Sequence, residues 1–180
     1  MKLEQTADGS YTLYVPELDE HYHSVKGALT ESQHIFIEMG LKHSPVSEPH
    51  ILEIGLGTGL NAFLTLLSAE ETRRKVHYTG IERYPLAEET LKQLDYPRLI
   101  GKQHEEDYYA IHRAPWNTET EVSPWFTLHK IEDDLPGFST RRKAAVPPFP
   151  YTISSTLMPS LPKNNPKCGN NLFSILYTRY

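Results

Sequence analysis

Three glycines at alternate positions stand out as the residues best suited to hold a ligand. A glycine lets the chain turn sharply and lets a ligand approach the backbone, because no Cβ is in the way. We expect a strand over 50–54 before them and an apolar-faced helix over 60–72 after them, whose first N–H groups lack partners within the helix. The sequence therefore predicts a ligand-binding loop at the carboxyl end of a strand, made of Glu53, Gly55, Gly57, Gly59 and Asn61.

Two acidic positions further along the chain indicate which ligand this loop binds. Glu82 follows an expected strand over 76–81, where its carboxylate can accept hydrogen bonds from both hydroxyls of a ribose. Asp133 follows an expected strand over 125–131 and can accept from the amino group of adenine, as could either adjacent acid. The spacing G-x-G-x-G differs from the dinucleotide pattern G-x-G-x-x-G, which reserves a helix N-terminus for pyrophosphate. The pattern favours S-adenosylmethionine, which has an adenosine but no phosphate; an ordinary tight turn beside a solvated Glu82 is the alternative.

The order of the expected elements predicts an α/β fold. A strand over 10–15 and a helix over 30–41, with Thr30 as N-cap, precede the glycines. A helix over 86–94 follows the second strand, whereas the acidic and aromatic segment 101–125 favours no assignment. A strand, a glycine turn, a helix and a second strand form a right-handed βαβ unit, and its two strands are parallel.

Composition excludes several classes of protein. The 180 residues include one cysteine, Cys168, so no internal disulfide can form and a reducing compartment, the cytoplasm, is expected. No stretch approaches the roughly 18 apolar residues of a membrane span, and the first residues lack the apolar core of a secretory signal. The histidines His21, His23 and His34 lack the spacing of metal ligands. We therefore expect neither a membrane partner nor a metal.

The N-terminal segment and the glycine run together resemble the MnmD/MnmC methyltransferases over about residues 10–135. The matching residues are Tyr22, Ser24, Gly27, Glu31 and Phe36, then the run from Gly55 to Asn61, then Glu82 with Tyr84-Pro-Leu. The resemblance implies a Rossmann-like fold that uses S-adenosylmethionine to methylate the aminomethyl group on a wobble uridine of certain tRNAs. It also implies tRNA as a partner. Four of the matching residues, in a polar segment ahead of a helix, are expected on the substrate side of the site: Tyr22, Ser24, Gly27 and Glu31.

The catalytic segment of this family is missing from its place. Members carry Asp-Ala-Phe-x-Pro-x-x-x-Pro-x-x-Trp at the end of their fourth strand, and the resemblance gives its Asp a part in catalysis. Residues 153–169 stand there instead and contain no such motif. The fold is therefore expected to be truncated after its cofactor-binding half, and we assign no catalytic residue.

A shift of reading frame explains the missing segment. When residues 153–169 are back-translated and read from the third base of the Ile153 codon, permitted codons give Leu-Ile-Tyr-Phe-Asp-Ala-Phe-Ala-Pro-Glu-Lys-Gln-Pro-Glu-Met-Trp. Met158 is always ATG and Pro159 begins with CC, so the alanine of this motif is fixed rather than chosen. We therefore predict a frameshift between about Leu135 and Pro150.

The composition changes where the frameshift is expected. Residues 1–135 hold all 23 acidic and 12 basic residues, a net charge of −11, whereas residues 136–180 hold six basic residues and no acid. Half of the 14 prolines also fall in that tail. We divide the chain into an N-terminal substrate-side extension (1–48), an S-adenosylmethionine-binding half (49–135) and an out-of-frame, disordered tail (136–180).

These observations favour a tRNA methyltransferase that is inactive as written, and they leave two other functions open. A methyltransferase for a small molecule or protein would suit the acidic body, because tRNA binding relies on basic surface. A non-catalytic nucleotide-binding remnant would explain why the catalytic motif is missing.

The frameshift hypothesis predicts that residues from about 137 onward form no native part of the fold. Limited proteolysis should remove them quickly, because out-of-frame residues have no history of selection for folding. Resequencing the gene across codons 130–150 checks the same hypothesis directly. A tail that resists cleavage in a cooperatively melting monomer would contradict it.

Overall fold

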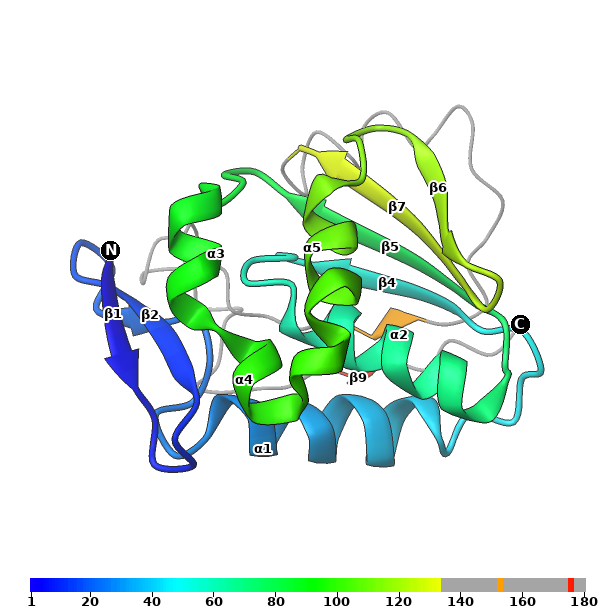
Figure 1. The fold of residues 1–180 in the computed structure, drawn as a ribbon, viewed down its shortest axis with the longest axis horizontal. Helices are drawn as coiled ribbons and strands as arrows, with labels where there is room; N and C mark the ends of the chain where they lie inside the picture. Colours follow the sequence, from blue (N-terminus) through cyan, green and yellow to red (C-terminus); the bar gives the residue numbers. More distant parts are fainter. Residues whose placement is uncertain (134–151, 154–174, 177–180) are drawn as a thin grey trace.

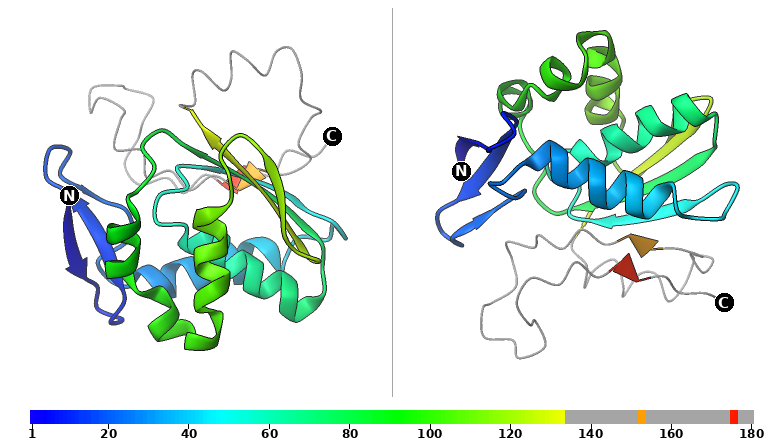
Figure 2. Two further views of the ribbon diagram at one scale, coloured as in Figure 1. Left: turned by 45° about the horizontal axis from the view of Figure 1, so that its top comes forward. Right: turned by 90° about the horizontal axis from the view of Figure 1, so that it is seen from below.

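The computed structural model describes residues 1–133, 152–153 and 175–176, and its architecture is mixed α/β. Helices cover one face of a central sheet that contains parallel strands (Figure 1). Two short strands, β8 (Thr152–Ile153) and β9 (Ile175–Leu176), pair with each other on the opposite face of this sheet (Figure 2). Apart from these four residues, the tail for which disorder is predicted lies outside the described residues.

The central sheet has the strand order β4-β5-β7-β6. Its strands are β4 (His50–Ile54), β5 (Val76–Glu82), β7 (Phe126–Glu132) and β6 (Glu119–Ser123). The first three are parallel, as the βαβ pattern predicts, and β6 pairs antiparallel with β7. Because the parallel strands run in register, Glu82 at the end of β5 lies opposite Glu132 of β7. Within the described residues β4 pairs on one side only.

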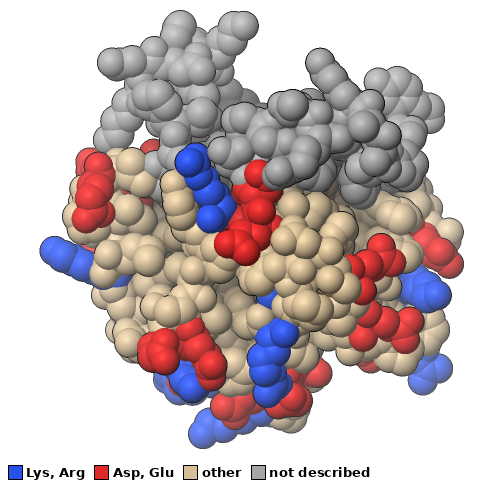
Figure 3. Space-filling view, turned by 90° about the horizontal axis from the view of Figure 1, so that it is seen from above, with Lys and Arg blue, Asp and Glu red and all other residues tan. Residues whose placement is uncertain are grey.

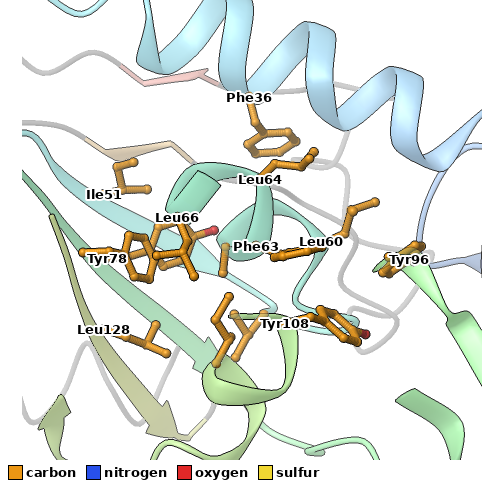
Figure 4. Close-up of a cluster of buried hydrophobic side chains, with 14 of the residues drawn as sticks. Phe36, Ile51, Leu60, Phe63, Leu64, Leu66, Tyr78, Tyr96, Tyr108 and Leu128 are labelled. Atoms are coloured by element: carbon orange, nitrogen blue, oxygen red, sulfur yellow. The ribbon is translucent and has the colours of Figure 1, made fainter. Parts of the chain in front are cut away.

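Helix α2 (Leu60–Thr72) is the centre of the molecule and has the bounds that the sequence predicts. It lies between the sheet, the N-terminal helix and α5 (Glu105–Arg113), so nearly all of its first ten residues are buried. Phe63 is fully buried and packs against Tyr108 of α5, with ring centroids 5.2 Å apart (Figure 4). Burial of each of these large rings stabilises the folded state by about 2–3 kcal/mol. This packing sets the position of the loop that precedes α2.

The connection between β5 and β6 is mostly helical. Its first helix confirms the one predicted over 86–94, whereas the sequence favoured no assignment for the segment 101–125. The connection contains α3 (Glu88–Leu94), α4 (Tyr96–Ile100), the 3₁₀ turn η2 (Lys102–His104) and α5. Three acidic residues occupy the first turn of α5, where they interact favourably with its free N–H groups. Only two of its residues, Tyr108 and Ile111, are buried. Such a thin apolar stripe is difficult to recognise in the sequence.

The N-terminal helix begins two residues before its predicted N-cap. It consists of α1 (Ala28–Ser32) and η1 (Gln33–Leu41), which winds with wider π-type hydrogen bonds. The prediction of Thr30 as N-cap is wrong, because the acceptors for the first turn come from another part of the chain. The N–H groups of Ala28, Leu29 and Thr30 donate to side chains of residues 6–10.

The capping side chains lie in the turn between β1 (Lys2–Gln5) and β2 (Tyr11–Val15), which form a small antiparallel sheet with β3 (Glu20–His21). Thr6 accepts from Ala28, Ser10 from Leu29 and Asp8 from Thr30, the last at 2.8 Å. Burial alone would raise the pKa of Asp8, but the hydrogen bonds from Ser10, Thr6 and Thr30 outweigh it and hold this pKa well below its usual range. The small sheet therefore caps the helix.

Asp8→Ala should lower the free energy of unfolding by about 1–2 kcal/mol, as loss of a helix cap does. In the native chain this contribution should be present above about pH 4. It should fade as the pH falls, because the carboxylate is protonated at a lower pH in the folded state than in the unfolded state. Urea unfolding at pH 7 and at pH 3.5 measures both effects. Glu17→Ala, at an exposed carboxylate in the turn between β2 and β3, is the control and should change little. An equal loss in both variants would contradict the capping role.

Candidate functional site

The glycine loop lies at the carboxyl ends of β4 and β5 and has the conformation that only glycine adopts easily. The φ angles of Gly55, Gly57 and Gly59 are 84°, 52° and 70°, all in the left-handed region. The N–H groups of Gly55 and Leu56 donate to the carbonyl of Ile81, at 2.8 and 3.0 Å. The loop is therefore bound to the end of the neighbouring strand.

Glu82 joins the loop through its side chain. Its carboxylate accepts from the N–H of Gly57 at 2.9 Å and from the N–H of Tyr84 at 2.8 Å. Its backbone carbonyl accepts from the N–H of Asp133 at 3.0 Å. The structure thus brings together the glycines, the predicted ribose acid and the predicted adenine residue.

Glu53 and Asn61 lie behind the loop, in the interior. Asn61 donates to one carboxylate oxygen of Glu53 at 2.8 Å, and Tyr78 donates its hydroxyl to the other at 2.6 Å. Glu53 is only 2% exposed, and burial together with its charge raises the pKa of Tyr78 well above the usual value. Because Glu53 is buried and both of its oxygens accept hydrogen bonds from within the protein, this arrangement favours support of the loop over direct contact with a ligand.

The four predicted substrate-side residues separate into two groups. Ser24, Gly27 and Glu31 form the turn that starts α1: the N–H of Ser24 donates to the Glu31 carboxylate, and the N–H of Gly27 donates to the Ser24 carbonyl. Tyr22 instead lies against the glycine loop. A Cβ on Gly57 would stand 2.9 Å from the ring of Tyr22. Burial, and then the charge of Glu82, raise the pKa of Tyr22 to about 12.

Two histidines that the sequence did not assign to the site flank the same loop. His23 forms a hydrogen bond to the hydroxyl of Thr58 at 2.8 Å, and burial lowers its pKa to about 4. His112 of α5 lies beside Gly59, where an added Cβ would stand 2.7 Å from its ring. Burial, and then Lys130, lower the pKa of His112 to about 4. Both imidazoles are therefore neutral at pH 7.

Lys130 is buried in β7 below His112. Its ammonium donates to the carbonyl of His112 at 2.6 Å and lies 4.5 Å from the ring centre of Trp116. Burial lowers the pKa of Lys130 to about 8. A cation at the C-terminal end of α5 interacts favourably with the carbonyls there. Lys130 therefore anchors α5 to the sheet beside the loop.

Three curated or solved proteins similar to this chain carry the same family name. "tRNA 5-methylaminomethyl-2-thiouridine biosynthesis bifunctional protein MnmC" of Magnetococcus marinus is 34% identical over 94 residues, 48% of this chain and 14% of that protein. The protein of the same name from Burkholderia mallei is 33% identical over 119 residues, 63% of this chain and 16% of that protein. The crystal structure of MnmC2 from Aquifex aeolicus matches with a TM-score of 0.60 and 26% identity, and covers 81% of this chain and 45% of that one.

The chain is a relative of the MnmC proteins. The resemblance seen in the sequence is thus confirmed, although no family model matches the chain. It spans about a seventh of the length of the curated MnmC proteins and less than half of the solved MnmC2 chain. The mixed α/β architecture with parallel strands also agrees with the MnmC2 structure.

Among residues 1–133, 152–153 and 175–176, no group of three or more histidine, cysteine or acidic side chains is arranged to hold a metal. In that same part of the chain no helix combines the length and apolarity needed to cross a membrane.

Two glycine variants test the contact between Tyr22 and the loop. Gly57→Ala should lower the free energy of unfolding by about 2–4 kcal/mol, because a left-handed alanine costs about 1–2 kcal/mol and its Cβ must also displace the Tyr22 ring. Gly9→Ala is the matched control, since Gly9 also has a left-handed φ of 83° but nothing within 4 Å of an added Cβ. Urea unfolding compares the two. Equal losses would show that Tyr22 does not rest on Gly57.

Proposed function

We propose that residues 49–133 are the S-adenosylmethionine-binding half of a Rossmann-like methyltransferase of the MnmC type. The observation that carries this proposal is the hydrogen bond between the Glu82 carboxylate and the Gly57 amide. It holds the carboxylate that we propose as the ribose acceptor against a glycine loop at the carboxyl ends of adjacent parallel strands, which is where α/β sheets bind nucleotides.

The residues around the loop fit this cofactor. Each carboxylate oxygen of Glu82 accepts one backbone N–H and retains a lone pair, so both ribose hydroxyls can donate to it. Gly55 and Gly57 leave the backbone open to close approach. Asp133, held next to Glu82 through the backbone, would accept from the adenine amino group. When bound, the cofactor supplies a methyl group on a sulfonium for transfer to an amine.

The substrate side of the site is incomplete in this proposal. Ligands in open α/β sheets bind where the strand order reverses, between the loops of two strands that lead in opposite directions. All described connections lead from β4 toward β5 and β7, so the loop after β4 forms one wall of such a crevice. In an intact relative, the opposite wall would come from later strands, which would carry the Asp-Ala-Phe segment. We propose that the frameshift removed it and that the chain as written does not transfer methyl groups.

The substrate proposed for an intact relative is the aminomethyl group of a modified wobble uridine in tRNA, on the strength of the names of the MnmC relatives. An unprotonated amine would attack in line with the methyl group, and orientation would supply most of the rate. A carboxylate would help to remove the proton.

A methyltransferase for a small molecule or protein is the second candidate, because residues 1–135 carry a net charge of −11. Lys and Arg side chains are also interspersed with Asp and Glu on the face seen in Figure 3, and the described residues of that face form no continuous basic patch. A gel shift with tRNA across a salt titration separates the two candidates, since phosphate contacts weaken steeply with salt.

Restoring the reading frame should yield a chain that binds S-adenosylmethionine in calorimetry, and Glu82→Gln should weaken this binding at least tenfold. The substitution replaces a charged acceptor for two hydroxyls by a neutral amide with one acceptor oxygen, and such charge-assisted bonds contribute about 1.5–3 kcal/mol.

Glu89→Gln is the control for this experiment, because Glu89 is an exposed carboxylate on the nearby helix α3. It should leave the affinity unchanged. If the restored chain prefers NAD, or binds S-adenosylmethionine equally well with Gln at position 82, the proposed site is wrong.

A further inference from the structure

Two consecutive residues of the N-terminal segment contact two consecutive residues of the glycine loop. The ring of Tyr22 lies over Gly57, and the imidazole of His23 is hydrogen-bonded to the Thr58 hydroxyl at 2.8 Å. Both residues come directly after β3, more than thirty positions before the loop in the sequence. The contact is therefore a tertiary one that the loop cannot make by itself.

The segment that makes these contacts is itself well anchored. The N–H of Tyr22 donates to the carbonyl of Leu13 at 2.9 Å, and the N–H of His23 donates to the buried hydroxyl of Thr12 at 2.9 Å. Leu13 is 2% exposed and belongs to the core. A continuous path of hydrogen bonds thus leads from β2 through His23 to Thr58.

The opposite side of the loop is held by α5. Tyr108 donates its hydroxyl to the carbonyl of Thr58 at 3.1 Å, and the ring of His112 lies beside Gly59. Thr58 is only 1% exposed, so its hydroxyl has no access to bulk water in place of His23. A buried hydroxyl that loses its partner costs free energy, and the loop would have to move to satisfy it.

We propose that Tyr22, His23 and Thr58 form a positioning clamp that holds the glycine loop in its cofactor-binding conformation. The idea that this cofactor is S-adenosylmethionine rests on the function proposed above, but the clamp itself does not. The N-terminal segment then acts on the affinity for the cofactor as well as on the substrate side. His23 and Thr58 act through the loop and touch neither reactant.

Thr58→Val tests the clamp in the full 180-residue chain, because it removes the hydroxyl and nearly preserves the shape of the side chain. Amide hydrogen exchange is measured without any ligand. The N–H groups of Gly55, Leu56, Gly57 and Gly59 are all hydrogen-bonded, so their exchange reports opening of the loop. We expect exchange in residues 55–59 to be about tenfold faster, the order expected when one buried hydrogen bond is lost, with α2 and β5 unchanged.

Thr58→Ser is the matched control, since it keeps the hydroxyl and should restore exchange to within about twofold of the native rate. Rescue by serine separates loss of the hydrogen bond from loss of packing. Unchanged exchange in Thr58→Val, or equal acceleration in the loop, α2 and β5, would overturn the proposal.

His23→Leu approaches the same bond from the other side and serves if Thr58→Val fails to fold. The double variant should open the loop no more than either single variant, because both remove one interaction. Additive effects would overturn the clamp.

Binding of S-adenosylhomocysteine is then measured in the same variants. Thr58→Val should weaken it about tenfold and Thr58→Ser should not. If the native chain does not bind this probe but Thr58→Val still opens the loop, the proposed cofactor is wrong and the clamp is supported. A loop that opens while affinity stays unchanged would show that the clamp does not set the binding conformation.

Discussion

Three left-handed glycines in five residues form a loop that has little regular structure of its own, and the surrounding structure must therefore supply its conformation. The Glu82 carboxylate satisfies the amide of Gly57 and, through Tyr84, also shapes the turn after β5. One ionised side chain thus connects the ends of two parallel strands. Without it, the Gly57 amide would lose a charge-assisted bond, which is about twice as strong as a neutral one.

The interior supports the same loop from below. Glu53 is buried one position before the end of β4, where Asn61 from α2 and Tyr78 from β5 both donate to it. These bonds connect the strand before the loop, the helix after it and the neighbouring strand. A buried carboxylate is tolerated because its oxygens are satisfied, and removal of either donor would leave a charged acceptor short of a partner.

The sequence predicts the parts of the fold in which local pattern and tertiary environment agree. β4 and α2 have their predicted bounds, because each is an apolar run of the right length with glycines at the boundary. The predicted cap at Thr30 is wrong because the true acceptors lie some twenty residues earlier, in the turn of a hairpin. No local signal reports such a distant partner.

The candidate site follows the same division. Its glycines and Glu82 could be recognised from spacing, because the carboxyl ends of adjacent parallel strands meet at one edge. That the side chain of Glu53 points inward could also have been predicted, because strand alternation places it on the same face as the buried Ile51. His112 could not be found, because it lies on a helix whose polar, aromatic sequence favoured no assignment. His23 lies in the segment that the sequence singled out, but its hydrogen bond to Thr58 could not be predicted, because only the folded chain brings the two residues together.

The contacts that hold the loop come from β5, the N-terminal segment and α5, and all of these precede residue 134. None of them uses the strands that, in the proposed function, would complete the substrate side. The conformation of the loop is thus determined independently of the segment to which catalysis is assigned. In the proposed function, cofactor binding and methyl transfer are therefore separable, because the described residues already contain the charge and hydrogen bonds that shape the loop. Loss of the Asp-Ala-Phe segment would remove the second without disturbing Glu82, Gly57 or Thr58.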